Sequence, residues 1–157
     1  MSELENIHLF AIVGLTGAGK STVTDYFTKK GIPKIDASDG VSATEIISQA
    51  EGIAGAGQHR AVIDGIDTWA TYRTLKHEFP GHITTIAIEA SRHHRHHRLT
   101  KRAEDPIPES EVDQLDYSDI EDNNEGGIIA IADKHIENNG SLDELHDQLD
   151  TLLAQNN

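Results

Sequence analysis

Apolar residues fall in short runs, separated by stretches where they recur every three or four positions, and this pattern predicts alternating strands and helices. The expected strands are residues 8–13, 32–35, 61–64, 83–88 and 135–137. The second and third strands are each completed by an aspartate, Asp36 and Asp64. Strands that alternate with helices form parallel sheets, which bind ligands at the carboxyl ends of their strands.

Polar residues and glycines mark the ends of the predicted helices. Ser42-x-x-Glu45 and Ser141-x-x-Glu144 resemble capping boxes that open helices. An apolar stripe indicates another helix at residues 68–79. Three glycines within residues 51–60 predict a loop there.

The junction after the first strand carries a phosphate-binding pattern. The run Gly14-Leu15-Thr16-Gly17-Ala18-Gly19-Lys20-Ser21 fits G-x-x-x-x-G-K-[ST] and is followed by Thr22 in the first helix. Glycines bring backbone amides close to phosphate oxygens because no Cβ intervenes. The helix that follows adds the positive end of its dipole. We expect these residues to bind a nucleoside triphosphate, with Lys20 on the β- and γ-phosphates and Ser21 on Mg²⁺. A plain glycine-rich turn would need neither the lysine nor the serine.

Length, composition and charge limit the remaining possibilities. The chain has 157 residues, of which 36% are hydrophobic, and this predicts a single domain spanning 1–157. It contains no cysteine, has an acidic start and lacks an apolar run long enough for a membrane span, so we expect a cytoplasmic protein with no membrane partner. A formal net charge of −14 argues against nucleic acid as a partner. No feature of the sequence predicts the oligomeric state.

Charge reverses sharply between two neighbouring segments. Residues 91–102 hold five Lys or Arg and no acid, whereas residues 103–125 hold ten acids and no base. The basic segment could focus positive charge on a small anionic ligand. Alternatively, the two segments could be oppositely charged faces that pair with each other.

Four histidines lie within the basic segment, at positions 93, 94, 96 and 97. On a helix, His93 shares a face with His96 and His97, a spacing that can bind a transition metal. The interleaved arginines would repel a cation. Imidazoles placed near phosphate are the alternative interpretation.

Several segments together resemble the small-molecule P-loop kinases, near dephospho-CoA kinase and the adenylate kinase-type nucleotide kinase-related proteins. They are residues 14–21, the run Gly-Ile-Pro-Lys-Ile-Asp-Ala at 31–37, Val-Ile-Asp-Gly-Ile at 62–66, and the run 132–142 with its Asn-Asn-Gly-Ser-Leu end. The R-x-x-R-L pattern from Arg95 to Leu99, followed by Arg102, is similar to the lid helix of that family. The resemblance implies an α/β fold: a three-layer P-loop NTPase fold whose five-stranded parallel sheet is flanked by helices, with a short lid at about 92–125.

The resemblance also implies an activity and site residues. It implies transfer of the γ-phosphoryl group of ATP, with Mg²⁺, to a nucleotide-like small molecule such as a nucleoside monophosphate or dephospho-CoA. Beyond the P-loop, it implies Asp36 as the base or acceptor-orienting carboxylate, and Asp64 at the metal or the acceptor. It also implies Arg95, Arg98 and Arg102 over the phosphates. Asn139 and Gly140 are implied at the adenine. A turn or capping role for Asp36 stays open.

Two positions depart from the family pattern. Asp67 stands where related nucleotide kinases commonly carry a basic residue, and residues 115–119 stand where a second arginine cluster is expected. Two further functions therefore stay open. One is a nucleotide-binding regulatory module with weakened transfer, and the other is a stand-alone NTP hydrolase.

Overall fold

The computed structural model describes residues 3–37, 40–66 and 68–155. Five strands form one parallel sheet in the order β2-β3-β1-β4-β5. Their bounds are β1 His8–Val13, β2 Lys34–Asp36, β3 Arg60–Asp64, β4 Ile83–Glu89 and β5 Lys134–Glu137. The predicted sheet is confirmed, with each predicted strand close to its observed position.

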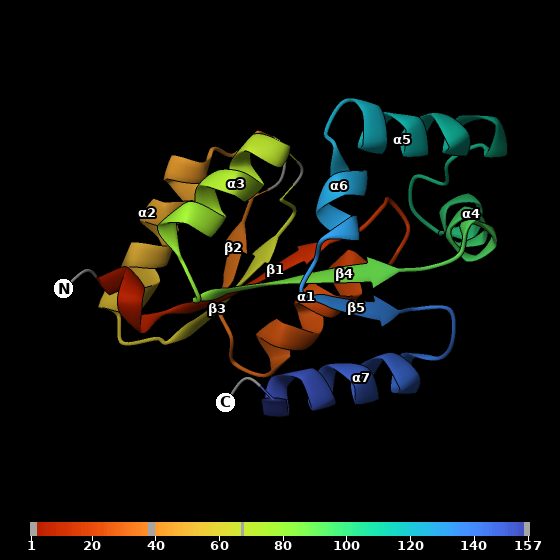
Figure 1. Ribbon diagram of the computed structural model, residues 1–157. Helices are drawn as coiled ribbons and strands as arrows, with labels where there is room; N and C mark the ends of the chain where they lie inside the picture. Colours follow the sequence, from red (N-terminus) through yellow and green to blue (C-terminus); the bar gives the residue numbers. More distant parts are fainter. Residues whose placement is uncertain (1–2, 38–39, 67, 156–157) are drawn as a thin grey trace.

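Helices cover both faces of the sheet (Figure 1). The helices are α1 Lys20–Lys29, α2 Ala43–Gly55, α3 Trp69–Glu78, α4 Arg92–Lys101, α5 Glu109–Glu121, α6 Glu125–Ala130 and α7 Leu142–Gln155, after a short 3₁₀ turn at Glu3–Asn6. In Figure 1, α2, α3 and α6 lie on one side of the strands and α1 and α7 on the other. Helices α4 and α5 lie beyond the arrowhead of β4, at the carboxyl ends of the strands.

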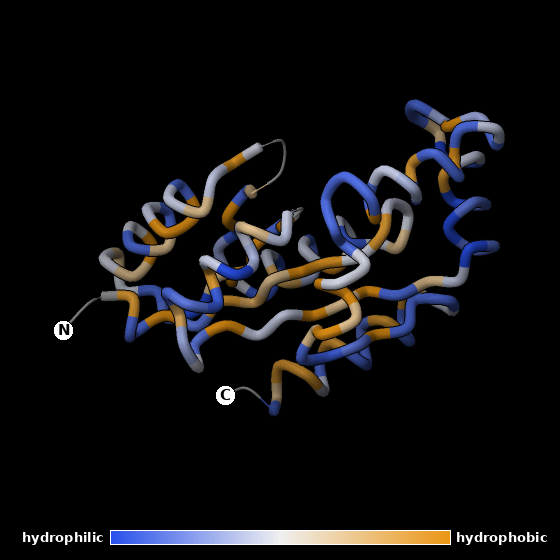
Figure 2. The backbone as a smooth tube through the Cα atoms, turned by 45° about the horizontal axis from the view of Figure 1, so that its top comes forward, coloured by the Kyte–Doolittle hydropathy of each residue, from blue (hydrophilic) through white to orange (hydrophobic). Residues whose placement is uncertain are grey.

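Two apolar cores follow from the alternation of side chains along the buried strands. In β1, Leu9 and Ala11 face the core shared with α2, α3 and α6, whereas Phe10 and Ile12 face the core shared with α1 and α7. All four side chains are fully buried. Because a parallel sheet is covered on both faces, its inner strands β1, β3 and β4 are mostly buried, whereas the edge strands β2 and β5 each bury a single residue. Figure 2 shows orange, hydrophobic stretches running through the middle of the molecule.

One predicted loop is shorter than expected. The glycines in residues 51–60 predict a loop, but α2 continues through Glu51 and Gly52 to Gly55. Ile53 and Ala54 pack against the core of that face, so tertiary packing outweighs the low helix propensity of glycine. The capping prediction for α2 is confirmed, since the Ser42 hydroxyl accepts a hydrogen bond from the Glu45 amide.

None of the described helices is both long and apolar enough to cross a membrane.

Candidate functional site

The P-loop lies at the carboxyl end of β1 and leads directly into α1. Gly19 is the N-cap of α1, with a φ of 107° that L-residues rarely adopt, and Lys20 is the first helical residue. The Lys20 ammonium donates a hydrogen bond to the carbonyl of Gly14 at 2.7 Å. This bond holds the ammonium over the loop, where the sequence predicts phosphate.

A pocket of about 400 Å³ opens beside the P-loop. It is lined by Thr16, Gly17, Gly19, Lys20, Ser21, Thr22, Arg98, Leu99 and Arg102. The structure therefore brings two of the three predicted α4 arginines to the same cavity as the P-loop. Leu15 and Ala18 line a smaller cavity of about 130 Å³ elsewhere on the loop, together with Arg95.

The glycines of the P-loop are also required by close packing against other parts of the chain. A Cβ on Gly14 would lie 2.6 Å from the carbonyl oxygen of Ile88 in β4. A Cβ on Gly17 would lie 3.0 Å from the Leu99 side chain of α4, and one on Gly19 would collide with the amide nitrogen of Asn138. Close approach of protein atoms is therefore sufficient to account for these glycines.

Asn138 follows β5 and links the P-loop to the end of the sheet. Its buried Nδ2 donates to the carbonyl of Ala18 at 2.8 Å. Sequence reasoning singled out the next two residues, Asn139 and Gly140, and missed Asn138. Both of those residues are exposed, and Asn139 Oδ1 accepts a hydrogen bond at 2.7 Å from the amide of Ser91, the N-cap of α4. The Asn-Asn pair thus ties the P-loop and α4 to one turn.

The two aspartates lie at strand ends, as the sequence predicts, and the strand order makes them neighbours. Asp36 ends β2 and is in register with Asp64, which ends β3. Asp64 is also in register with Ile12 of β1, two residues before the P-loop. Asp36 is exposed and Asp64 is half-buried. Both carboxylates therefore belong to the same sheet edge as the P-loop.

The three arginines that the sequence predicts over the phosphates have different surroundings. Arg95 is buried, and its guanidinium donates to both carboxylate oxygens of Asp116, at 2.6 and 3.1 Å. Arg98 donates to the carbonyls of Gly17 and Asn138. Burial lowers the pKa of the Arg98 guanidinium. Arg102 is exposed at the end of α4 and donates to the carbonyl of Asp105 at 2.6 Å.

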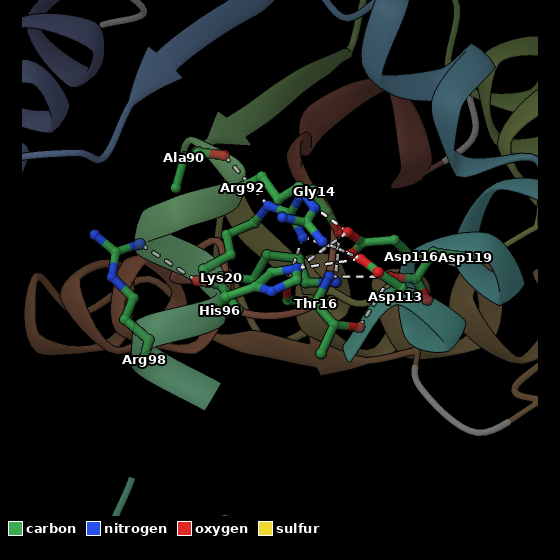
Figure 3. Close-up of polar contacts among 12 residues, drawn as sticks. Gly14, Thr16, Lys20, Ala90, Arg92, His96, Arg98, Asp113, Asp116 and Asp119 are labelled. Carbon is green, nitrogen blue, oxygen red and sulfur yellow. Dashed lines mark hydrogen bonds and ion pairs between the residues drawn. The ribbon is translucent and has the colours of Figure 1, made fainter. Parts of the chain in front are cut away.

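The basic and acidic segments pair with each other where α4 packs against α5. Besides the buried Arg95–Asp116 pair, Arg92 and Asp113 form an exposed ion pair at 2.6 Å. In Figure 3, Asp113, Asp116 and Asp119 gather on one side and Arg98 points away from them. Arg92 and Arg95 therefore fit the interpretation that the basic and acidic segments pair with each other. Arg98 and Arg102 instead line the P-loop pocket.

Two carboxylates at the P-loop were not predicted from the sequence. Asp119 Oδ2 accepts hydrogen bonds from the backbone amide and the hydroxyl of Thr16, at 3.0 and 2.9 Å. Glu125, at the start of α6, is buried and lies 3.9 Å from the Lys20 ammonium. The only available signal was their place in the acidic segment, because helix periodicity does not reveal which residue meets a distant loop.

Among the described residues, the histidines alone form no group with metal-ligand spacing, although His93, His96 and His97 line one cavity. Instead, His96 lies near Asp113 and Asp116, with its Nε2 at 3.6 and 4.0 Å from their carboxylates, and the donor atoms of the three residues fall within 4.8 Å of one another. The guanidiniums of Arg92 and Arg95 already neutralise these carboxylates. Their positive charge disfavours a cation at this cluster.

Sequence comparison finds distant relatives. No family model matches the chain. A UPF0200 protein of Thermococcus gammatolerans is 25% identical in an alignment 177 positions long, gaps included, which spans 92% of this chain and 93% of the relative. Its name states no activity.

Structural comparison identifies the fold. A structure of TT1252 from Thermus thermophilus superposes with a TM-score of 0.69 at 18% identity, covering 96% of this chain and 98% of that chain. Shikimate kinase from Bacteroides thetaiotaomicron gives 0.61 at 11% identity, covering 94% and 97%. The Mycobacterium tuberculosis APS kinase CysC, in complex with AMPPNP and APS, gives 0.56 at 18% identity, covering 95% and 98%. The chain has the fold of the P-loop kinases. The narrower resemblance to dephospho-CoA kinases stays a prediction.

Proposed function

We propose that this chain is an ATP-dependent kinase that transfers the γ-phosphoryl group to a nucleotide-like small molecule, such as a nucleoside monophosphate or dephospho-CoA. The observation that carries the proposal is the pocket in which Lys20 and the P-loop face Arg98 and Arg102. Backbone amides, one ammonium and two guanidiniums around one cavity suit a triphosphate. The kinase fold of the structural neighbours supports the same reaction class.

In this proposal the P-loop amides bind the phosphates, and Lys20, Arg98 and Arg102 neutralise their charge. Ser21 and Asp64 offer a hydroxyl and a carboxylate, the oxygen ligands that Mg²⁺ prefers, so they suit this ion. Bound Mg²⁺ would supply charge neutralisation between the β- and γ-phosphates. Asn139 and Gly140 would lie towards the adenine.

The acceptor would bind at the sheet edge formed by β2 and β3. Its oxygen forms a bond to the γ-phosphorus as the bond to the β–γ bridging oxygen breaks, which releases ADP. Asp36, exposed at this edge, takes the acceptor proton or orients the acceptor.

The whole chain would act as one domain in the cytoplasm, with residues 92–125 as its lid. Arg95 joins the phosphate-binding set only if its ion pair with Asp116 opens, because its guanidinium is already occupied.

The test is an acceptor panel with ATP and Mg²⁺. The panel contains nucleoside monophosphates and dephospho-CoA, together with shikimate and adenosine phosphosulfate, which correspond to the structural neighbours. Lys20→Ala removes the ammonium and should abolish transfer, since losing a group that stabilises the transferring phosphate costs on the order of 10³-fold or more in rate. Lys29→Ala, at the exposed end of α1, is the matched control and should retain it.

The outcomes separate three functions. A phosphorylated acceptor supports the kinase, whereas ADP formed at one rate with every acceptor identifies an NTP hydrolase. Tight ATP binding without turnover identifies a regulatory module. The ion pairs of Arg92 and Arg95 with aspartates favour this alternative, because they occupy guanidiniums that could otherwise bind phosphate. Failure of the wild-type chain to bind any nucleoside triphosphate in calorimetry contradicts the proposal.

A further inference from the structure

Carboxylates of the acidic segment lie against polar groups of the P-loop. Asp119 accepts from the Thr16 amide and hydroxyl, and Glu125 lies 3.9 Å from the Lys20 ammonium. The guanidinium of the nearby Arg95 forms an ion pair with the Asp116 carboxylate. Three carboxylates, from α5 and α6, thus reach the loop and the basic helix beside it.

We propose that Asp119 is an internal anion that holds Thr16 of the P-loop, and that a nucleoside triphosphate must displace it. This inference rests on the proposed nucleotide site. A carboxylate and a phosphate both present negatively charged oxygens to N–H and O–H donors. The Thr16 amide has a single hydrogen, so a carboxylate and a phosphate compete for it.

The packing of α5 is consistent with a displaceable contact. Among the α5 residues, all of which the structure describes, only Val112 is buried. Tyr117, two residues before Asp119, and Ile120, the residue after it, are 51% and 46% exposed. The carboxyl half of α5 therefore buries little apolar surface, and little hydrophobic free energy opposes its movement away from the loop.

Displacement of Asp119 would also change the surroundings of the Lys20 ammonium. Helix α6 begins four residues after α5 ends, and its first residue is Glu125. Helices α5 and α6 are in direct contact. A shift of α5 is therefore transmitted to the carboxylate beside the Lys20 ammonium, which frees that ammonium for phosphate.

The competition predicts which ligands gain when Asp119 is neutralised. Hydrogen bonds to a charged partner contribute about 1.5 kcal/mol or more, which corresponds to about tenfold in affinity. We expect Asp119→Asn to bind AMPPNP, a non-hydrolysable triphosphate, about tenfold more tightly than wild type, and to bind ADP with a smaller gain.

The control is Asp122→Asn, which removes the same charge from an exposed position at the end of α5. Calorimetry with Mg²⁺-AMPPNP and Mg²⁺-ADP is performed on wild type and both variants, after thermal melts show that each is folded. Hydrogen exchange provides a second measurement, in which AMPPNP should increase exchange of the α5 amides in wild type.

Each outcome decides the proposal. A gain in AMPPNP affinity for Asp119→Asn that Asp122→Asn does not share supports it. Equal affinities in all three proteins overturn it while leaving the proposed nucleotide site intact, and weaker binding by Asp119→Asn overturns it by assigning Asp119 to the bound state. Absence of nucleotide binding in wild type and both variants overturns the proposed function, and this inference with it.

Discussion

Single residues in this structure join elements that are far apart in the sequence. Asn138 is the main example, since its side-chain amide donates to a P-loop carbonyl 120 residues away and packs where Gly19 has no side chain. His8, at the start of β1, is another, since its ring nitrogen lies 2.8 Å from the hydroxyl of Thr84 in β4. Each such residue sets the position of a neighbouring strand or loop.

His8 makes stability depend on pH. Burial lowers its pKa from 6.5, the proximity of His82 lowers it further, and Asp133 opposes both effects. The unfolded chain therefore binds more protons than the folded chain between the lowered pKa and 6.5, so this contribution to stability is lost as the pH falls through that window. We expect His8→Gln to lose less stability than wild type between pH 7.5 and pH 5.5 in urea denaturation.

The control for this experiment is His77→Gln, which removes an imidazole whose side chain is 87% exposed. An identical pH response of His8→Gln and wild type would show that His8 does not produce the effect.

At the scale of elements, α4 is held by contacts with two other parts of the chain, the P-loop and α5. Leu99 packs onto Gly17 of the P-loop, while Arg95 is bonded to Asp116 of α5. The helix expected to act as a lid therefore packs directly on the loop. The position of α4 depends on one apolar contact and one largely buried ion pair. The side chains of that pair, Arg95 and Asp116, are 7% and 13% exposed.

The two ion pairs between α4 and α5 should differ in their effect on stability. Arg95→Ala leaves the Asp116 carboxylate buried without its guanidinium, and we expect a loss of about 3 kcal/mol in the free energy of unfolding. Arg92→Ala removes an exposed pair and should change stability little, because water already solvates both groups. Urea denaturation of both variants measures the difference. Equal losses would mean that burial does not determine the strength of these pairs.

At the scale of the whole molecule, a five-stranded sheet between two helical layers carries an acidic surface. The formal net charge is −14, and the bases of α4 are largely engaged by the acids of α5 and by loop carbonyls. Like charges spread over a compact surface repel one another and favour the unfolded chain, in which they are further apart.

Salt should therefore stabilise the folded chain. Raising NaCl from about 0.01 M to about 1 M shortens the screening length from ~30 to ~3 Å and weakens this repulsion. A gain of about 1 kcal/mol would raise the melting temperature by ~2–4 °C. Differential scanning calorimetry across that range measures it. A melting temperature that falls with salt would instead indicate that attractive ion pairs dominate.

The local pattern of the sequence was sufficient to locate much of the site. The spacing of Gly14, Gly19 and Lys20 marks a strand-to-helix junction, and an aspartate after an apolar run marks the carboxyl end of a strand. Since parallel strands bring their carboxyl ends to one edge, Asp36 and Asp64 could be predicted to lie at the same edge as the P-loop. Their pairing in register depends on the strand order, which the tertiary structure decides. These features depend on residues close together in the chain and on a regular topology.

The partners of the polar side chains were decided only by the tertiary structure. Arg95 and Asp116 are 21 residues apart, and Thr16 and Asp119 are 103 apart. Helix periodicity shows which residues share a face, but not which face meets a given loop or helix. The angle at which α4 and α5 cross the sheet edge results from packing of the whole chain, and it alone places an acid on the P-loop and determines which arginines face the pocket.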